Sequence, residues 1–113
     1  SLLGVLCNRP MGMQTGRIKN YQITAASMWD TFHGPYLARL HRPRRGRYIG
    51  AWSAKYNNHY QWLQVDFKRA AKIIKISTQG RQDTYQWVTQ YYVTRSLDRV
   101  HFMPYMERNS IKV

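Results

Sequence analysis

Ser27, Asp30 and His33 are the residue types that carry out nucleophilic hydrolysis, in which a base removes the proton of an attacking hydroxyl. Such triples occur by chance in most chains, and no catalytic signature surrounds this one. The carboxylates that acid–base catalysis would need are scattered, at Asp30, Asp66, Asp83, Asp98 and Glu107. We therefore do not expect an enzyme.

Metal binding is the second chemistry to test, because the chain has four histidines and one cysteine. His33, His41, His59 and His101 stand at none of the spacings typical of a zinc site. The scattered carboxylates likewise give no support for calcium, so we expect neither a metal nor a cofactor. Cys7 leaves two alternatives open, a bond to a partner outside the chain as given or a buried free thiol.

Positive charge is the strongest chemical signal in the sequence. Eighteen Lys and Arg against five Asp and Glu give a formal net charge of +13, and residues 39–47 hold five of the arginines. Charge of this kind favours polyanionic partners: nucleic acid, acidic glycans or anionic lipid. Nucleic acid is the least expected, since no helix-turn-helix, zinc-finger or RRM-type signature is present.

The elements that would position these residues are expected to be strands. A length of 113 residues with 43% apolar residues fits one folded domain and excludes a disordered polycation. No run approaches the roughly 20 apolar residues that span a bilayer, and helical periodicity is weak. Alternation and β-branched residues predict strands over residues 22–25, 61–67, 72–78 and 91–96. Long segments between them, over residues 27–37, 39–47 and 81–87, favour binding loops on an all-β sandwich or barrel.

Several motifs in order resemble one family. Its central signature is formed by Ala51-Trp52, the run Trp62-Leu63-Gln64-Val65-Asp66 and the segment IIKISTQG at 73–80. Further matches are Cys7 with PMGM at 10–13, GRIKNYQITAAS at 16–27, ARLH at 38–41, TQGR at 78–81, WVT at 87–89 and Pro104-Tyr105. Together they resemble the coagulation factor V/VIII type C domain, or discoidin domain, and the TQGR and WVT motifs resemble those of contactin-associated proteins.

The resemblance implies a discoidin-like jelly-roll β-sandwich with binding loops at one end. It also implies an extracellular module, secreted or at the cell surface, whose relatives bind phosphatidylserine membranes, glycans, collagen or protein receptors. By this comparison residues 1–6 are a leader or linker remnant, and residues 7–113 are a domain that lacks its C-terminal strands, with the disulfide partner of Cys7 absent. Arg99 stands where the family has a glycine, which puts the geometry of that turn in question.

The resemblance places candidate binding residues in the loops. Trp29 and Phe32 fall in the first projecting loop, followed by the arginine cluster and, in a later loop, Tyr85; the cluster comprises Arg42, Arg44, Arg45 and Arg47. Two alternatives stay open: Trp29 packing against Tyr36, and the arginines forming only a solvated loop. The expected core comprises Trp52, Trp62, Leu63, Val65, Ile73, Ile76 and Trp87, and Arg39 is expected to pair with Asp66.

The predicted function is adhesion or ligand binding, with the aromatic and arginine-rich loops docking on an anionic membrane surface or an acidic glycan. The alternative is a protein–protein adhesion domain of a larger cell-surface or matrix protein, which would bind a protein receptor or matrix protein. A sugar-specific lectin is a more distant alternative, and it would show saturable binding that salt leaves unchanged.

Overall fold

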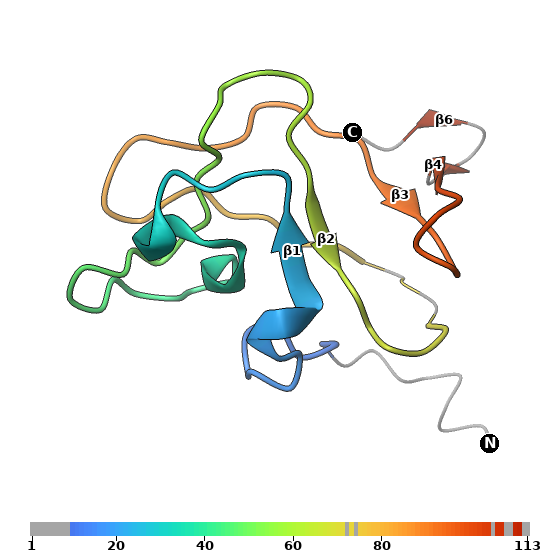
Figure 1. Ribbon diagram of the computed structural model, residues 1–113, viewed down its shortest axis with the longest axis horizontal. Helices are drawn as coiled ribbons and strands as arrows, with labels where there is room; N and C mark the ends of the chain where they lie inside the picture. The colour runs from blue at the N-terminus through green and yellow to red at the C-terminus, as the bar shows by residue number, and fades with distance from the viewer. Residues whose placement is uncertain (1–9, 72, 74, 105, 108–109, 112–113) are drawn as a thin grey trace.

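An antiparallel pair of strands lies at the centre of the structure, with the loop-rich segments gathered on one side of it (Figure 1). The structure is a computed structural model and describes residues 10–71, 73, 75–104, 106–107 and 110–111. Cys7 and the expected remnant 1–6 lie outside the described residues. Strand β1 (Ile23–Ala25) pairs with β2 (Leu63–Val65), so that Ile23 faces Val65 and Ala25 faces Leu63. Both strands fall inside segments that the sequence predicts to be extended.

The remaining strands are two residues long. Strand β3 (Thr94–Arg95) pairs with β4 (Met103–Pro104), and β5 (Met106–Glu107) pairs with β6 (Ser110–Ile111), both antiparallel. Three single-turn 3₁₀ helices complete the described elements: η1 (Asn20–Gln22), η2 (Thr31–His33) and η3 (Pro35–Leu37). The prediction of a strand-rich chain with little helix is confirmed. No helix in the described part of the chain is long and apolar enough to cross a bilayer.

The predicted strands are longer than the observed ones. Residues 73 and 75–78 of the expected strand 72–78 are not in a strand, and only Thr94–Arg95 of the expected strand 91–96 is. β-branched residues favour an extended backbone, but a strand also needs a hydrogen-bonded neighbour. Where residues 10–111 are described, they form three separate two-stranded sheets. They do not show the two packed sheets of the expected jelly-roll.

The buried core is small and lies beside the central pair. Its fully buried apolar side chains are Ile18, Ile23, Leu37 and Ile49. The predicted core is wrong for Trp62, Leu63, Ile76 and Trp87, which are exposed, and only partly right for Trp52, Val65 and Ile73, which are half-buried. The exposed side chains have no covering layer, because no second sheet packs on these strands among the described residues.

Gln22 joins the first turn of the fold to the end of β2. Its side-chain amide donates to the carbonyl of Asp66 at 2.8 Å, and its carbonyl oxygen accepts from the backbone N–H of Lys19 at 2.9 Å. The backbone N–H of Asp66 returns a bond to the carbonyl of Gln22 at 2.8 Å. This buried polar side chain therefore fixes η1 against the central pair, with its hydrogen-bonding groups satisfied.

Arg39 is the buried cation of the fold, with 8% of its surface exposed. Its guanidinium donates to the carbonyl of Met13 at 2.6 Å, to the side-chain oxygen of Asn20 at 2.8 Å and to the carbonyl of Tyr36 at 3.0 Å. The expected pair with Asp66 is wrong, because Asp66 contacts Lys68 at 3.6 Å and Arg99 at 3.3 Å instead. Neutral acceptors thus satisfy the donors of Arg39.

The turn before β4 has Arg99 where the resemblance expects a glycine. Arg99 adopts a left-handed backbone with φ of 65°, the conformation that glycine adopts more readily. Asp98 holds the turn, since its carboxylate accepts from the hydroxyl of Ser96 at 2.9 Å and from the backbone N–H groups of Val100 and His101 at 2.9 and 2.8 Å. The ring of His101 lies 2.7 Å away. These contacts, that of the His101 side chain first, lower the pKa of Asp98 well below its usual range.

Replacing Arg39 by methionine should destabilise the protein by about 2–4 kcal/mol, because three acceptors lose a charged donor while the aliphatic volume is kept. The measurement is the free energy of unfolding in urea. Arg47→Met, at an exposed position of the same segment, is the matched control and should change stability by no more than about 0.5 kcal/mol. Equal effects of the two substitutions would refute the structural role of Arg39.

Acid should destabilise the protein partly through Asp98. Its folded pKa lies below its unfolded value, so the stabilisation is present above the unfolded pKa of about 3.9 and is lost as the pH falls toward the folded one. Thermal melting from pH 6 to pH 2 should show a falling midpoint below about pH 4. Asp98→Asn should melt lower at pH 6 and lose less on acidification. An equally steep fall in both proteins would contradict this assignment.

Candidate ligand-binding surface

Trp29 projects from a loop that hydrogen bonds hold at its base. We call residues 27–34 the Trp29 loop. The backbone N–H of Trp29 donates to the carbonyl of Ser53 at 2.8 Å, while the residue is 62% exposed. Asp30 caps η2 by accepting from the N–H of Phe32 at 2.9 Å, and the ring of His33 lies 2.5 Å from its carboxylate. That contact lowers the pKa of Asp30. A fixed backbone therefore presents a largely solvated indole.

The candidate Ser27–Asp30–His33 triad is not assembled. Asp30 and His33 do meet, but the hydroxyl of Ser27 bonds to the side-chain oxygen of Gln61 at 2.5 Å. The same hydroxyl accepts from the backbone N–H of Lys55 at 3.0 Å. Ser27 therefore anchors the loop and is not aligned with the histidine as a nucleophile would be. In the part of the chain that the structure describes, no three metal-ligating side chains gather.

Phe32 connects the Trp29 loop to the arginine cluster. Its ring meets the ring of Tyr48 edge to face, with centroids 4.9 Å apart, and its carbonyl accepts from the N–H of Ile49 at 3.1 Å. Phe32 is half-buried. The sequence predicts Phe32 as a binding residue beside Trp29; the structure shows it in a contact that positions one loop against the other.

Residues 42–48, which we call the arginine turn, fold back on themselves. The N–H of Arg45 donates to the carbonyl of Tyr48 at 2.8 Å, and the N–H of Tyr48 donates to the carbonyl of Arg45 at 3.0 Å. Gly46 takes the left-handed conformation that the tight turn requires, with φ of 60°. At the root of the turn, Gly50 lies so close to Arg42 that an added Cβ would clash with the carbonyl oxygen of Arg42.

The four predicted arginines lie in different surroundings. Arg42 and Arg45 line a cleft, whereas Arg44 lies 3.6 Å from the carboxylate of Asp83. Arg47 is exposed. Arg42 and Arg45 of the turn thus line the cleft, and Arg44 and Arg47 lie outside it.

Tyr85 lies in the segment that approaches the arginine turn through Asp83. This carboxylate contacts Arg81 at 2.5 Å as well as Arg44, and the hydrogen bond from Arg81 is the largest cause that lowers its pKa. Tyr85 itself is 96% exposed. The structure therefore leaves Tyr85 available to a ligand, although it does not line the cleft.

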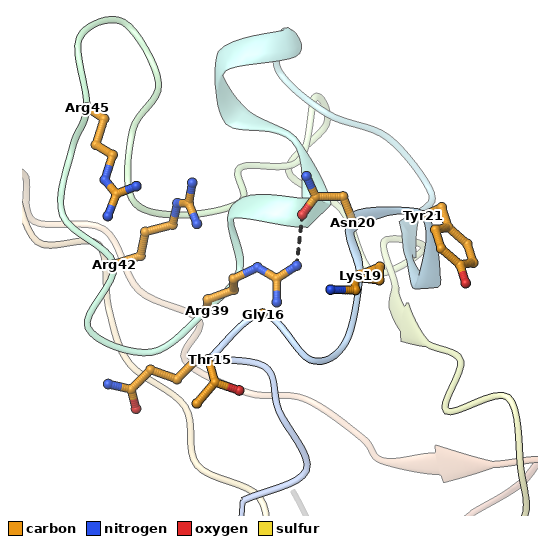
Figure 2. A pocket seen from close by; sticks show the side chains of 9 residues that line it. Thr15, Gly16, Lys19, Asn20, Tyr21, Arg39, Arg42 and Arg45 are labelled. Atoms are coloured by element: carbon orange, nitrogen blue, oxygen red, sulfur yellow. Dashed lines mark hydrogen bonds between the residues drawn. The ribbon is translucent and has the colours of Figure 1, made fainter.

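The cleft opens between the segment 14–21 and the arginine-bearing segment 39–45. It has a volume of about 780 Å³ and is lined by Gln14, Thr15, Gly16, Lys19, Asn20, Tyr21, Arg39, Arg42 and Arg45. Figure 2 shows the charged ends of Arg45, Arg42, Arg39 and Lys19 one after another across it, with Arg39 bonded to Asn20. A second hollow of about 180 Å³ adjoins it, sharing Gln14, Arg39, Arg42 and Arg45 and reaching His41 and Pro43.

Among the described residues, no carboxylate lines this cleft. The four aspartates of the described chain, Asp30, Asp66, Asp83 and Asp98, all have basic partners elsewhere. Burial, and then the charge of Arg42, lower the pKa of the Arg39 guanidinium. The cleft is therefore a concentration of positive charge that an external anion would relieve.

Sequence reasoning identified the arginines of the cleft and missed its other wall. Lys19, Asn20 and Tyr21 stand about twenty residues before the cluster, in the motif GRIKNYQITAAS at 16–27, which carries the resemblance but no predicted binding residue. Their polar types in sequence carry no spacing that signals a site. The only available signal was the resemblance itself, which covers this segment without assigning it a role.

Comparison with known proteins gives the family of the chain. Residues 22–112 match the F5/8 type C domain. The chain is 39% identical to coagulation factor V of Bos taurus over 111 residues, which cover 93% of the chain and 5% of that protein. The chain belongs to the F5/8 type C domain family. This confirms the resemblance to the factor V/VIII type C domain.

Other relatives of this F5/8 type C domain are similar over nearly all of its length. The chain is 36% identical to the human EGF-like repeat and discoidin I-like domain-containing protein 3 over 114 residues, and 36% identical to rat lactadherin over 115 residues. These alignments cover 94% and 95% of the chain, but 23% and 26% of the two proteins. The relatives are extracellular proteins, in agreement with the expected extracellular location.

Gly50→Ala should loosen the arginine turn, because the new methyl group clashes with the Arg42 carbonyl. We expect a loss of about 1–3 kcal/mol in stability and faster hydrogen exchange at the N–H of Ile49, which bonds to Phe32. Gly46→Ala is the control: its Cβ would meet nothing within 4 Å, so it should strain its own backbone and leave the Ile49 N–H protected. Unchanged exchange in Gly50→Ala would refute the close contact.

Proposed function

We propose that the chain is an extracellular binding module that docks on anionic phospholipid membranes through the Trp29 loop and the arginine turn. The observation that carries the proposal is the exposure of Trp29 on a loop whose base is fixed by the bond to Ser53. A solvent-exposed tryptophan on a fixed backbone suits the membrane interface, because the indole has an apolar ring that enters the lipid and an N–H group that stays hydrated.

The expected energies favour weak, reversible docking. Burial of one large apolar side chain contributes roughly 1.5–3 kcal/mol, and each cation near an anionic lipid surface contributes about 1 kcal/mol. Arg44 and Arg47 lie outside the cleft, on the turn that Phe32 and Tyr48 fasten to the Trp29 loop. Trp29 with Arg47 gives a weak affinity that should fall as salt rises, because exposed charges are screened. Arg44 adds less, since the carboxylate of Asp83 lies 3.6 Å from it.

The domain assignment is part of the same proposal. The described strands belong to one discoidin-like domain with a jelly-roll β-sandwich. Family membership supports this assignment, because the family implies a β-sandwich. Binding without catalysis, and without a cofactor or a metal, is the activity proposed for it.

A protein–protein adhesion domain is the second candidate. Exposed apolar side chains outside the Trp29 loop favour it, among them Trp62, Trp87 and Val88. Contiguous apolar patches on a surface mark sites that a partner covers. On this alternative, a protein receptor or matrix protein covers such side chains and the arginines contribute little.

Vesicle sedimentation tests the membrane proposal. The protein should bind vesicles of phosphatidylcholine with phosphatidylserine and ignore vesicles of phosphatidylcholine alone. Trp29→Ala should weaken this binding roughly tenfold or more, since it removes the apolar contact. Arg44→Gln/Arg47→Gln should weaken it less in high salt than in low salt.

Trp87→Ala is the matched control. The exposed fraction of Trp87, 65%, is similar to the 62% of Trp29, and Trp87 lies in another segment of the chain. It should leave vesicle binding unchanged. Equal losses in the two tryptophan variants would remove the special role of the Trp29 loop. If the intact protein ignores phosphatidylserine at physiological salt, the membrane proposal is wrong and protein–protein adhesion takes its place.

A further inference from the structure

We propose that the arginine turn is a site of proteolytic modification, at which a serine endoprotease with acidic subsites hydrolyses the peptide bond between Arg45 and Gly46. A run of basic residues ends at this bond, Arg42-Pro43-Arg44-Arg45. Arginines at the first, second and fourth positions before the bond fit a protease groove that offers a carboxylate-lined subsite to each guanidinium. The proposal does not depend on membrane docking.

The bond lies at the exposed tip of the turn. Residues 43–48 are all exposed, and an added Cβ on Gly46 would meet no atom within 4 Å. The space around the bond is therefore open on the side of the protein. Exposed loop tips are the preferred places of proteolytic cleavage, and the extracellular location of the chain brings the turn to the endoproteases of the secretory route.

Few bonds hold the turn closed. A protease groove takes its substrate as an extended strand, so the reciprocal backbone bonds between Arg45 and Tyr48, at 2.8 and 3.0 Å, must open. The guanidinium of Arg44 also donates to the carbonyl of Gly46 at 3.0 Å. A segment with few buried contacts opens at small cost, and its cleavage follows the population of the open form.

The three arginines of the run are available to a protease. Among the described lining residues of the cleft, no carboxylate accompanies Arg42 and Arg45. Arg44 lies 3.6 Å from Asp83, but both side chains are partly exposed and such a pair contributes little. Pro43 favours an extended backbone at Arg42, which is the conformation that a protease groove requires.

Another exposed basic pair of the chain does not fit the same groove. Lys68 and Arg69 are exposed, but Asp66 stands fourth before the bond that follows them, where the turn has Arg42. An acidic subsite would repel this carboxylate. The backbone N–H of Asp66 also donates to the carbonyl of Gln22 at 2.8 Å, beside the paired strands β1 and β2, and seating the segment in a groove would break this bond. Cleavage should therefore select the turn.

Hydrolysis breaks the C–N bond between Arg45 and Gly46. The serine of the protease attacks the carbonyl carbon of Arg45, and the nitrogen of Gly46 leaves with a proton as a new amino terminus; water then releases the acyl group as a carboxylate on Arg45. The chain has one cysteine, so no disulfide within it joins the fragments. They should stay associated, because β1 pairs with β2 across the cut and the N–H of Ile49 bonds to the carbonyl of Phe32.

Digestion of the folded chain with purified furin, a proprotein convertase that cuts after multibasic runs, tests the proposal. Mass measurement in denaturant should find fragments 1–45 and 46–113. Arg42→Ala should slow cleavage roughly tenfold or more, because it removes a charge-assisted contact with the protease. Arg47→Ala is the matched control: it removes the same charge from the same turn after the bond, and it should change the rate less than about threefold.

The location and specificity of the cut decide the result. Equal rates in the two variants would mean that the run is not recognised, and cutting after Arg47 or Arg69 in place of Arg45 would put the site elsewhere; each result overturns the proposal. Neither Arg42 nor Arg47 is buried, so both variants should keep the thermal midpoint of the parent protein. Unfolding would speed cleavage, so a slower Arg42→Ala variant is not explained by a lost fold.

A synthetic peptide of residues 38–50 separates the motif from the fold. It should be cut at the same bond as the folded chain. An uncut peptide would mean that the run is not a recognition sequence, and a cut peptide beside an uncut folded chain would mean that the turn does not open. Both results overturn the proposal. Failure of membrane docking in the vesicle experiment would leave the cleavage result unaffected.

Discussion

The buried guanidinium of Arg39 is the interaction on which the rest of the structure depends. It ties the segment of Met13 and the η1 residue Asn20 to the carbonyl of Tyr36 in η3. Four buried aliphatic side chains make a core too small to hold these segments by packing alone. Because its acceptors are neutral, Arg39 stabilises the fold without being neutralised, and the same group gives the cleft wall its charge.

The few acidic residues explain where the positive charge remains. Asp30 and Asp98 are bound to nearby histidines within single turns, and Asp66 and Asp83 hold Lys68, Arg81, Arg44 and Arg99. The aspartates therefore neutralise charge at turns and at one side of the arginine turn. Arg42, Arg45 and Lys19 keep theirs. Four of the eighteen Lys and Arg thus meet at the cleft without a carboxylate among its described lining residues.

The sequence predicted what depends on local patterns. Alternating side chains located β1 and β2, and the family motifs located the loops and the family itself. The prediction was wrong where contacts between distant segments determine the structure. Arg39 donates to the carbonyls of Met13 and Tyr36, and no local sequence pattern indicates that these groups lie beside it. Trp62 and Ile76 are exposed because no described layer covers them. The cleft needs Lys19 beside Arg42, a proximity that only the folded chain creates.

The geometry of the arginine turn explains how one short segment can serve two surfaces. The reciprocal bonds between Arg45 and Tyr48 fix the backbone, so each side chain has a set direction. Arg42 and Arg45 then line the cleft, while Arg44 meets Asp83, and the ring of Tyr48 holds Phe32 and with it the Trp29 loop. In a flexible loop, all the arginine side chains could turn toward the same anion. A closed turn divides that charge, so Arg42 and Arg45 at the cleft can be substituted separately from Arg44 and Arg47 outside it.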